Sequence, residues 1–106
     1  MACSQGEIQV ENNLQNSVIK NIEWGNLPVT EYLLPYENSY IRKINNSDYY
    51  DIKLPDTYSL RFYIEKDSIE IHYETVEKYT IESEKYVLIT IDENTELNIL
   101  SKKSIN

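Results

Sequence analysis

Residues 58–76, with the sequence YSLRFYIEKDSIEIHYETV, restrict the fold more than any other stretch, because two alternating runs meet there across a short polar segment. Large apolar side chains occupy every second position of each run, which is typical of β-strands with one buried face. These residues are Tyr58, Leu60, Phe62 and Ile64 in the first run and Ile69, Ile71 and Tyr73 in the second. We predict a β-hairpin with residues 65–68 as its loop, because this pairing places both apolar sets on one face. A shift of one residue would expose the apolar side chains of one strand to water.

The predicted hairpin also specifies which residues face each other across the two strands. On the buried face the expected pairs are Ile64 with Ile69, Phe62 with Ile71 and Leu60 with Tyr73. On the outer face the same register places His72 opposite Arg61, with Glu70 and Glu74 beside His72 on its own strand. We interpret this outer face as a charged exterior, because these four side chains would form an exposed charge cluster across the two strands.

Further strand signals follow one another along the chain, separated by turns that contain Asn, Gly, Ser or Pro. They lie at residues 7–11, 17–24, 30–34, 39–44, 49–54, 76–81 and 86–91. The segments 76–81 and 86–91 are expected to form a second hairpin across residues 82–85, with Val87, Ile89 and Ile91 on its buried face. Residues 39–44 are expected to be an edge strand, because charged residues occur on both of its faces.

Three details of these segments are testable against a structure. In residues 17–24, the alternation places Val18, Ile22 and Trp24 on one face, with Lys20 as the exception. We expect Trp24 to anchor the core, with a surface-binding role as the alternative. The inward residues expected in segment 49–54 are Tyr50, Ile52 and Leu54, and after Leu100 the chain is expected to fray.

The chain is therefore predicted to be an all-β protein, since no stretch of ten residues has a helical pattern. We predict a single antiparallel β-sandwich of about seven to eight short strands, immunoglobulin-like or transthyretin-like in arrangement, with a small barrel as the alternative. With 106 residues the chain has room for one domain, predicted at residues 7–106 behind a flexible tether at residues 1–6.

Charge excludes one class of partner. The net charge is -8, and ten acidic residues between positions 65 and 96 are accompanied only by Lys66, Lys78 and Lys85. Nucleic acid is not an expected partner, because binding phosphates requires a concentrated basic surface. The acidity indicates either a solvated exterior or a docking surface for a basic partner, and the sequence leaves both open.

Few residues suggest chemistry. His72 is the only histidine, and no nucleophile or second base is signalled near it, so we predict no enzyme activity. Asp92, Asn94 and Glu96 alternate as calcium ligands would, but the glycine and the distant glutamate of a hand-type loop are missing, so no metal or cofactor is predicted. A candidate interaction surface for a protein or carbohydrate ligand is formed by Tyr49, Tyr63, Arg61, His72, Glu70 and Glu74.

The N-terminus carries the one family resemblance. Ala2-Cys3-Ser4 resembles the end of a bacterial lipoprotein signal, and Cys3 is the only cysteine of the chain. The sequence Leu33-Leu34-Pro35 with Glu37 is also similar to small sandwich lipoproteins of bacterial envelopes, although a glycine would be expected in place of Tyr36.

The resemblance implies that Cys3 carries the lipid, that the protein lies at the cell envelope and that it touches the membrane only through this anchor. No basic and apolar signal segment precedes Ala2, so Met1 is expected to replace the signal of a natural precursor. The alternative is a small acidic cytoplasmic protein of the inhibitor or immunity type, in which Cys3 has no such role.

Overall fold

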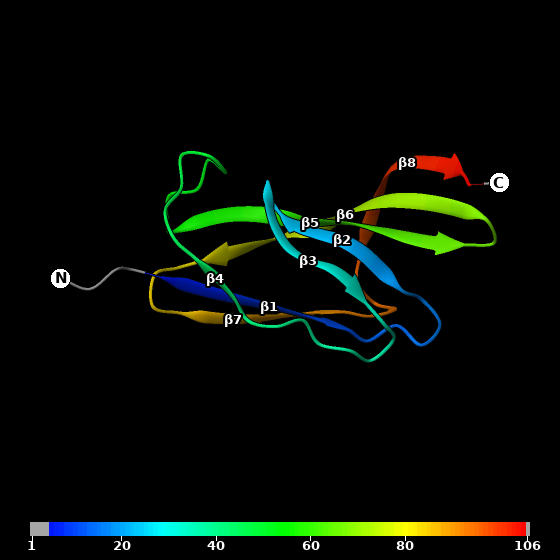
Figure 1. The fold of residues 1–106 in the computed structure, drawn as a ribbon, viewed down its shortest axis with the longest axis horizontal. Helices are drawn as coiled ribbons and strands as arrows, with labels where there is room; N and C mark the ends of the chain where they lie inside the picture. The colour runs from blue at the N-terminus through cyan, green and yellow to red at the C-terminus, as the bar shows by residue number, and fades with distance from the viewer. Residues whose placement is uncertain (1–4, 106) are drawn as a thin grey trace.

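The computed structural model describes residues 5–105, which form eight β-strands and no helix long and apolar enough to cross a membrane (Figure 1). The strands are β1 (Gly6–Asn12), β2 (Ile19–Trp24), β3 (Leu27–Leu33), β4 (Arg42–Ile44), β5 (Asp56–Lys66), β6 (Ile69–Ile81), β7 (Tyr86–Ile91) and β8 (Leu97–Ser104). They form a three-stranded sheet, β4-β1-β7, and a five-stranded sheet, β3-β2-β5-β6-β8. The predicted all-β sandwich is confirmed, with one parallel pair, β1 with β7, among antiparallel neighbours.

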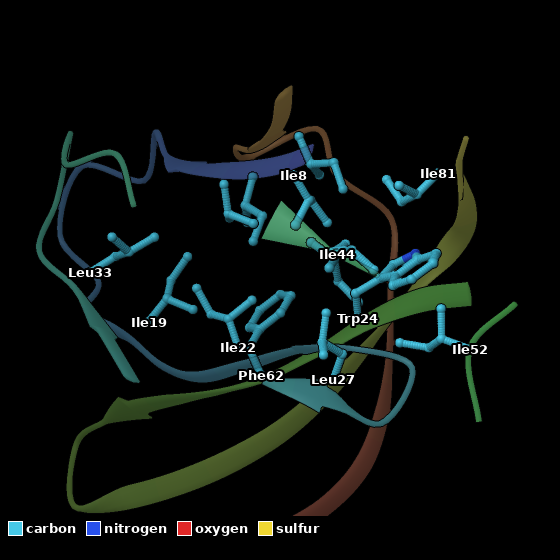
Figure 2. Close-up of a cluster of buried hydrophobic side chains, with 14 of the residues drawn as sticks. Ile8, Ile19, Ile22, Trp24, Leu27, Leu33, Ile44, Ile52, Phe62 and Ile81 are labelled. Carbon is cyan, nitrogen blue, oxygen red and sulfur yellow. The ribbon is translucent and has the colours of Figure 1, made fainter. Parts of the chain in front are cut away.

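The core lies between the two sheets. Figure 2 shows Ile8 and Ile44 of the smaller sheet facing Ile22 and Phe62 of the larger one. Trp24 is fully buried, and its indole Nε1–H donates a hydrogen bond to the Tyr79 carbonyl oxygen at 2.9 Å. Because this bond satisfies the one polar group of the ring, the indole can be buried completely. The predicted role of Trp24 as a core anchor is confirmed.

The hairpin of β5 and β6 forms, but its predicted loop and register are wrong. The turn consists of Asp67 and Ser68 alone, with φ angles of 54° and 63°. Two successive positive φ angles are the geometry of a type I′ turn, whose twist matches that of the strands it joins. The observed pairs on the buried face are Ile64 with Ile71 and Phe62 with Tyr73. The register is shifted by two residues, which preserves the faces because side chains alternate with a period of two.

The second predicted hairpin is also wrong, because β6 and β7 belong to different sheets. β6 continues without interruption to Ile81, and its edge near the hairpin turn pairs with β8. β7 instead pairs in parallel with β1, so that Val87 faces Ile8 and Ile89 faces Val10. The predicted buried face of β7 is nevertheless correct, since Ile89 and Ile91 are buried.

In strand β2 the alternation of buried and exposed side chains changes beside Lys20, the one residue that did not fit the predicted pattern. Asn21 has a φ of 50°, and the pairing of β2 with β5 shifts between Lys20 and Glu23. Such a β-bulge adds one residue to a strand and reverses which face the preceding side chains occupy. Ile19, rather than Val18, is therefore buried together with Ile22 and Trp24.

Two further predictions about the chain are corrected. Residues 49–54 are not a strand: they form a turn closed by a single bridge between Ser47 and Ile52, although Ile52 is buried as expected. The expected fraying after Leu100 is also wrong, because β8 extends to Ser104 and pairs with β6. The exposed edge of β6 supplies the hydrogen-bonding groups that order this segment. The predicted edge strand at residues 39–44 is confirmed in its shorter form, β4.

Candidate functional site

The outer face of β5 and β6 carries an ion pair between Arg61 and Glu74. These residues face each other in the register, and Arg61 Nε donates to Glu74 Oε2 at 2.9 Å. The hydrogen bond from Arg61 lowers the pKa of the Glu74 carboxyl below its ordinary value, against the opposing effect of burial. Glu74 is therefore a charged group held in place by its neighbour.

Tyr63 and His72 form an aromatic stack next to this ion pair. Their ring centroids are 4.1 Å apart, and the ring planes differ by 5°. The predicted opposition of His72 and Arg61 is wrong for the same reason as the register: the two-residue turn moves every partner by two positions. The result is a flat aromatic surface beside a charged one, both rigidly supported by paired strands.

Glu70 lies on the same outer face, between strands on both sides. Its backbone partner on β5 is Glu65, and its partner on β8 is Lys103. Glu65 itself accepts a contact from Lys20 Nζ at 3.4 Å. The outer face therefore carries charged side chains across the larger sheet, with Lys20 and Lys103 on either side of Glu65 and Glu70. The five predicted residues of β5 and β6 lie together on this face.

Tyr49 does not join that surface. It lies in the loop that precedes β5, is 88% exposed and contacts Tyr50 in an edge-to-face arrangement with a centroid distance of 4.8 Å. This loop lies near the end of the molecule where β1 begins, whereas the β5–β6 turn lies at the other end (Figure 1). The candidate interaction surface thus divides into an outer hairpin face and a separate tyrosine. Cys3, the predicted lipid attachment residue, lies outside the described residues.

The acidic turn after β7 is organised by its own hydrogen bonds. Asp92 Oδ1 accepts from the Asn94 backbone N–H at 2.8 Å and from the Thr95 hydroxyl at 3.3 Å. An aspartate that bonds backbone two residues ahead forms an Asx turn, which needs no metal. Between residues 5 and 105, no three His, Cys, Asp or Glu side chains gather as a metal site.

A groove that the sequence did not suggest lies between β6 and β7. Its volume is about 360 Å³. It is lined by Val76, Glu77 and Tyr79 of β6, by Leu88, Ile89 and Thr90 of β7, and by Asp92, Asn94, Thr95 and Glu96 of the following turn. The groove exists because β6 and β7 belong to different sheets and leave this side of the sandwich open. The predicted hairpin of these two segments would have closed it, which is why sequence reasoning missed it.

The groove is lined by both polar and apolar residues. Burial, with the nearby charge of Glu77, raises the pKa of the Tyr79 phenol above its ordinary value. Tyr79 lines the groove and can offer a hydroxyl and a ring surface to a bound group. Ile89 is buried, whereas Leu88 is 45% exposed at the edge of β7.

The pairing of the two sheets establishes a β-sandwich, but its finer class and its family depend on relatives. The immunoglobulin-like or transthyretin-like arrangement stays a prediction, and so does the resemblance carried by Cys3. Comparison with family models, curated proteins and solved structures gives no match for this chain.

Proposed function

We propose that this chain is a non-enzymatic binding domain of the bacterial cell envelope, held at the membrane by lipid attached to Cys3. The observation that carries the proposal is the sequence Ala2-Cys3-Ser4 immediately ahead of a β-sandwich whose first strand begins at Gly6. An extended chain spans at most about 3.6 Å per residue, so Gly6 lies within about 11 Å of the anchored residue. The anchor therefore holds the domain close to the bilayer.

The shape of the domain supports a display role. Its principal extents are 52 × 25 × 21 Å, and β1 begins near one end of the long axis (Figure 1). An anchor at that end directs the β5–β6 turn away from the membrane. The stacked Tyr63 and His72 then present a rigid aromatic face to a protein or carbohydrate ligand, beside the charges of Arg61 and Glu74. The membrane is contacted through the lipid alone.

Detergent partitioning tests the anchor. The gene is expressed from its natural start in a bacterial host, and the product is separated between Triton X-114 and water. We expect the protein in the detergent phase, because each buried acyl CH₂ contributes about 0.8 kcal/mol and several chains bind firmly. A Cys3→Ser variant is the matched control and is expected in the aqueous phase. An aqueous product with an unmodified Cys3 thiol would refute the lipoprotein proposal.

The second candidate is a small acidic inhibitor or immunity-type protein that docks on a basic partner. The observation that favours it is the carboxylates of Glu77, Asp92 and Glu96 around the groove, none of which forms an ion pair with a described residue. This candidate predicts a complex that forms again when the chain and its purified partner are mixed. The affinity of that complex should fall as the NaCl concentration is raised. A Glu77→Lys variant that binds the partner as well as the unmodified chain would count against it.

A further inference from the structure

One edge of β7 has backbone groups that no described residue uses. β7 pairs only with β1, and flanking bonds run from Glu7 N–H to the Lys85 oxygen at 2.9 Å and from Asn13 N–H to the Ile91 oxygen at 2.8 Å. In a parallel ladder, alternate residues of a strand turn both backbone groups to the same neighbour. Odd-numbered residues of this segment therefore face β1. The residues whose N–H and C=O groups point outward are Tyr86, Leu88 and Thr90.

The other sheet edges carry the features that prevent strand addition. β3 contains Pro28 and Glu31, β4 has three residues, and β8 carries Lys102 and Lys103. Proline, charge and shortness are the usual protections of an exposed edge. β7, with the sequence YVLITI, has no proline, charge or bulge and is six residues long. Among the four outermost strands of the two sheets, β7 is the one that lacks these protections.

The groove beside this edge favours a positively charged binding segment. Glu77, Asp92 and Glu96 line it, while Tyr79 and Ile89 supply ring and aliphatic surface. The three carboxylates are not neutralised by any ion pair of the described chain. A segment lying along β7 would point every second side chain toward these groups. Long basic side chains fit, because their alkyl stems cover apolar surface while their charged ends reach carboxylates.

We propose that the free edge of β7 binds an extended segment of a partner protein in which Lys or Arg alternates with β-branched or aromatic residues. The segment adds a fourth strand to the β4-β1-β7 sheet through the backbone groups of Tyr86, Leu88 and Thr90. Its basic side chains meet Glu77 and Glu96 in the groove, and its apolar side chains lie beside Leu88. The inference rests on the proposed binding role and is independent of the anchor at Cys3.

Charge argues against a second copy of this chain as the occupant. Each chain carries a net charge of -8. Pairing two β7 edges would bring two sets of the same groove carboxylates together, and like charges at close range are unfavourable. A basic partner removes this repulsion instead of adding to it.

The test uses a synthetic peptide with four Lys-Val repeats, acetylated and amidated at its ends, added at pH 7 to the isotope-labelled chain. We expect the backbone amide signals of Tyr86, Leu88 and Thr90 to shift in NMR spectra, and their hydrogen exchange to slow at least tenfold. The control peptide has the same side chains but an N-methyl group on every interior amide. It keeps the charge and loses the donors, so we expect at least tenfold weaker binding.

Two pairs of protein variants locate the contact. Leu88→Lys places a like charge on the β7 edge and is expected to weaken peptide binding at least tenfold. Tyr32→Lys makes the same charge change on the edge strand β3, at a side chain that is also half exposed, and is expected to leave binding within twofold. The double variant Glu77→Gln with Glu96→Gln is expected to weaken binding, whereas Glu23→Gln with Glu31→Gln is not. This second pair carries the test if Leu88→Lys does not fold.

Four results would overturn the proposal. They are equal binding of the N-methylated peptide, shifts centred away from β7, no binding at about 1 mM peptide, and a dimer with protected β7 amides before any peptide is added. None of these results depends on lipidation, which the detergent-partitioning experiment measures separately. Failure of strand addition and failure of the anchor are therefore distinguished.

Discussion

At the scale of single residues, the outer hairpin face is defined by pairs that a shift of two positions created. Arg61 meets Glu74, and Tyr63 meets His72. Their placement on the outer face could be predicted from alternation, because that property depends only on parity along the strand. Their partners could not, because the two-residue turn at Asp67 and Ser68 contains no glycine to mark its positive φ angles.

The lowered pKa of Glu74 predicts a pH-dependent contribution to stability. Its folded-state pKa is below the unfolded value, so the contribution is complete above the unfolded pKa and is lost as pH falls through the folded pKa. We expect Glu74→Gln to reduce the free energy of unfolding by about 0.2–1 kcal/mol at pH 7, because the side chains are partly exposed. The deficit should shrink at pH 3, as measured by urea unfolding. The control is Glu93→Gln, an exposed turn residue, and an equal deficit at both pH values would contradict the assignment.

At the scale of elements, the buried side chain of Thr75 links β5 and β6 where their pairing is irregular. The register of the two strands shifts between Ser59 and Arg61. Thr75 is 2% exposed there, and its Oγ1 accepts from the Leu60 N–H at 3.0 Å and donates to the Glu77 carbonyl oxygen at 2.7 Å. The hydroxyl thus replaces ladder bonds that the bulge removes.

Replacing this hydroxyl tests its role. Thr75→Val keeps the volume but leaves a buried N–H group unsatisfied, so we expect a loss of about 1–3 kcal/mol in the free energy of unfolding. Thr75→Ser retains the hydroxyl and is the matched control, expected to lose less. Urea unfolding measures both variants. If valine were as stable as serine, the hydrogen bonds of Thr75 would have no structural role.

At the scale of the whole molecule, the open β7 edge and the net charge act against each other. The edge favours strand pairing between copies, and the charge of -8 opposes it. The isoelectric point is about 4.6, so repulsion between copies falls as the pH approaches that value.

Self-association should therefore depend on pH. We expect the apparent mass from light scattering to at least double between pH 7 and the isoelectric region. Leu88→Lys should suppress this increase because it charges the edge, whereas Tyr32→Lys, with the same change in net charge, should not. Equal association of the two variants would show that β7 is not the contact.

Local alternation by itself determined which side chains of β5 and β7 are buried, because a period of two needs no knowledge of neighbouring strands. Leu60, Phe62, Ile89 and Ile91 were placed correctly on this basis. Only the tertiary structure decided which strands pair, and it placed β7 beside β1 and opened the groove next to β6. Backbone hydrogen-bonding groups are the same in nearly every residue, so the choice of partner depends on contacts between distant parts of the chain.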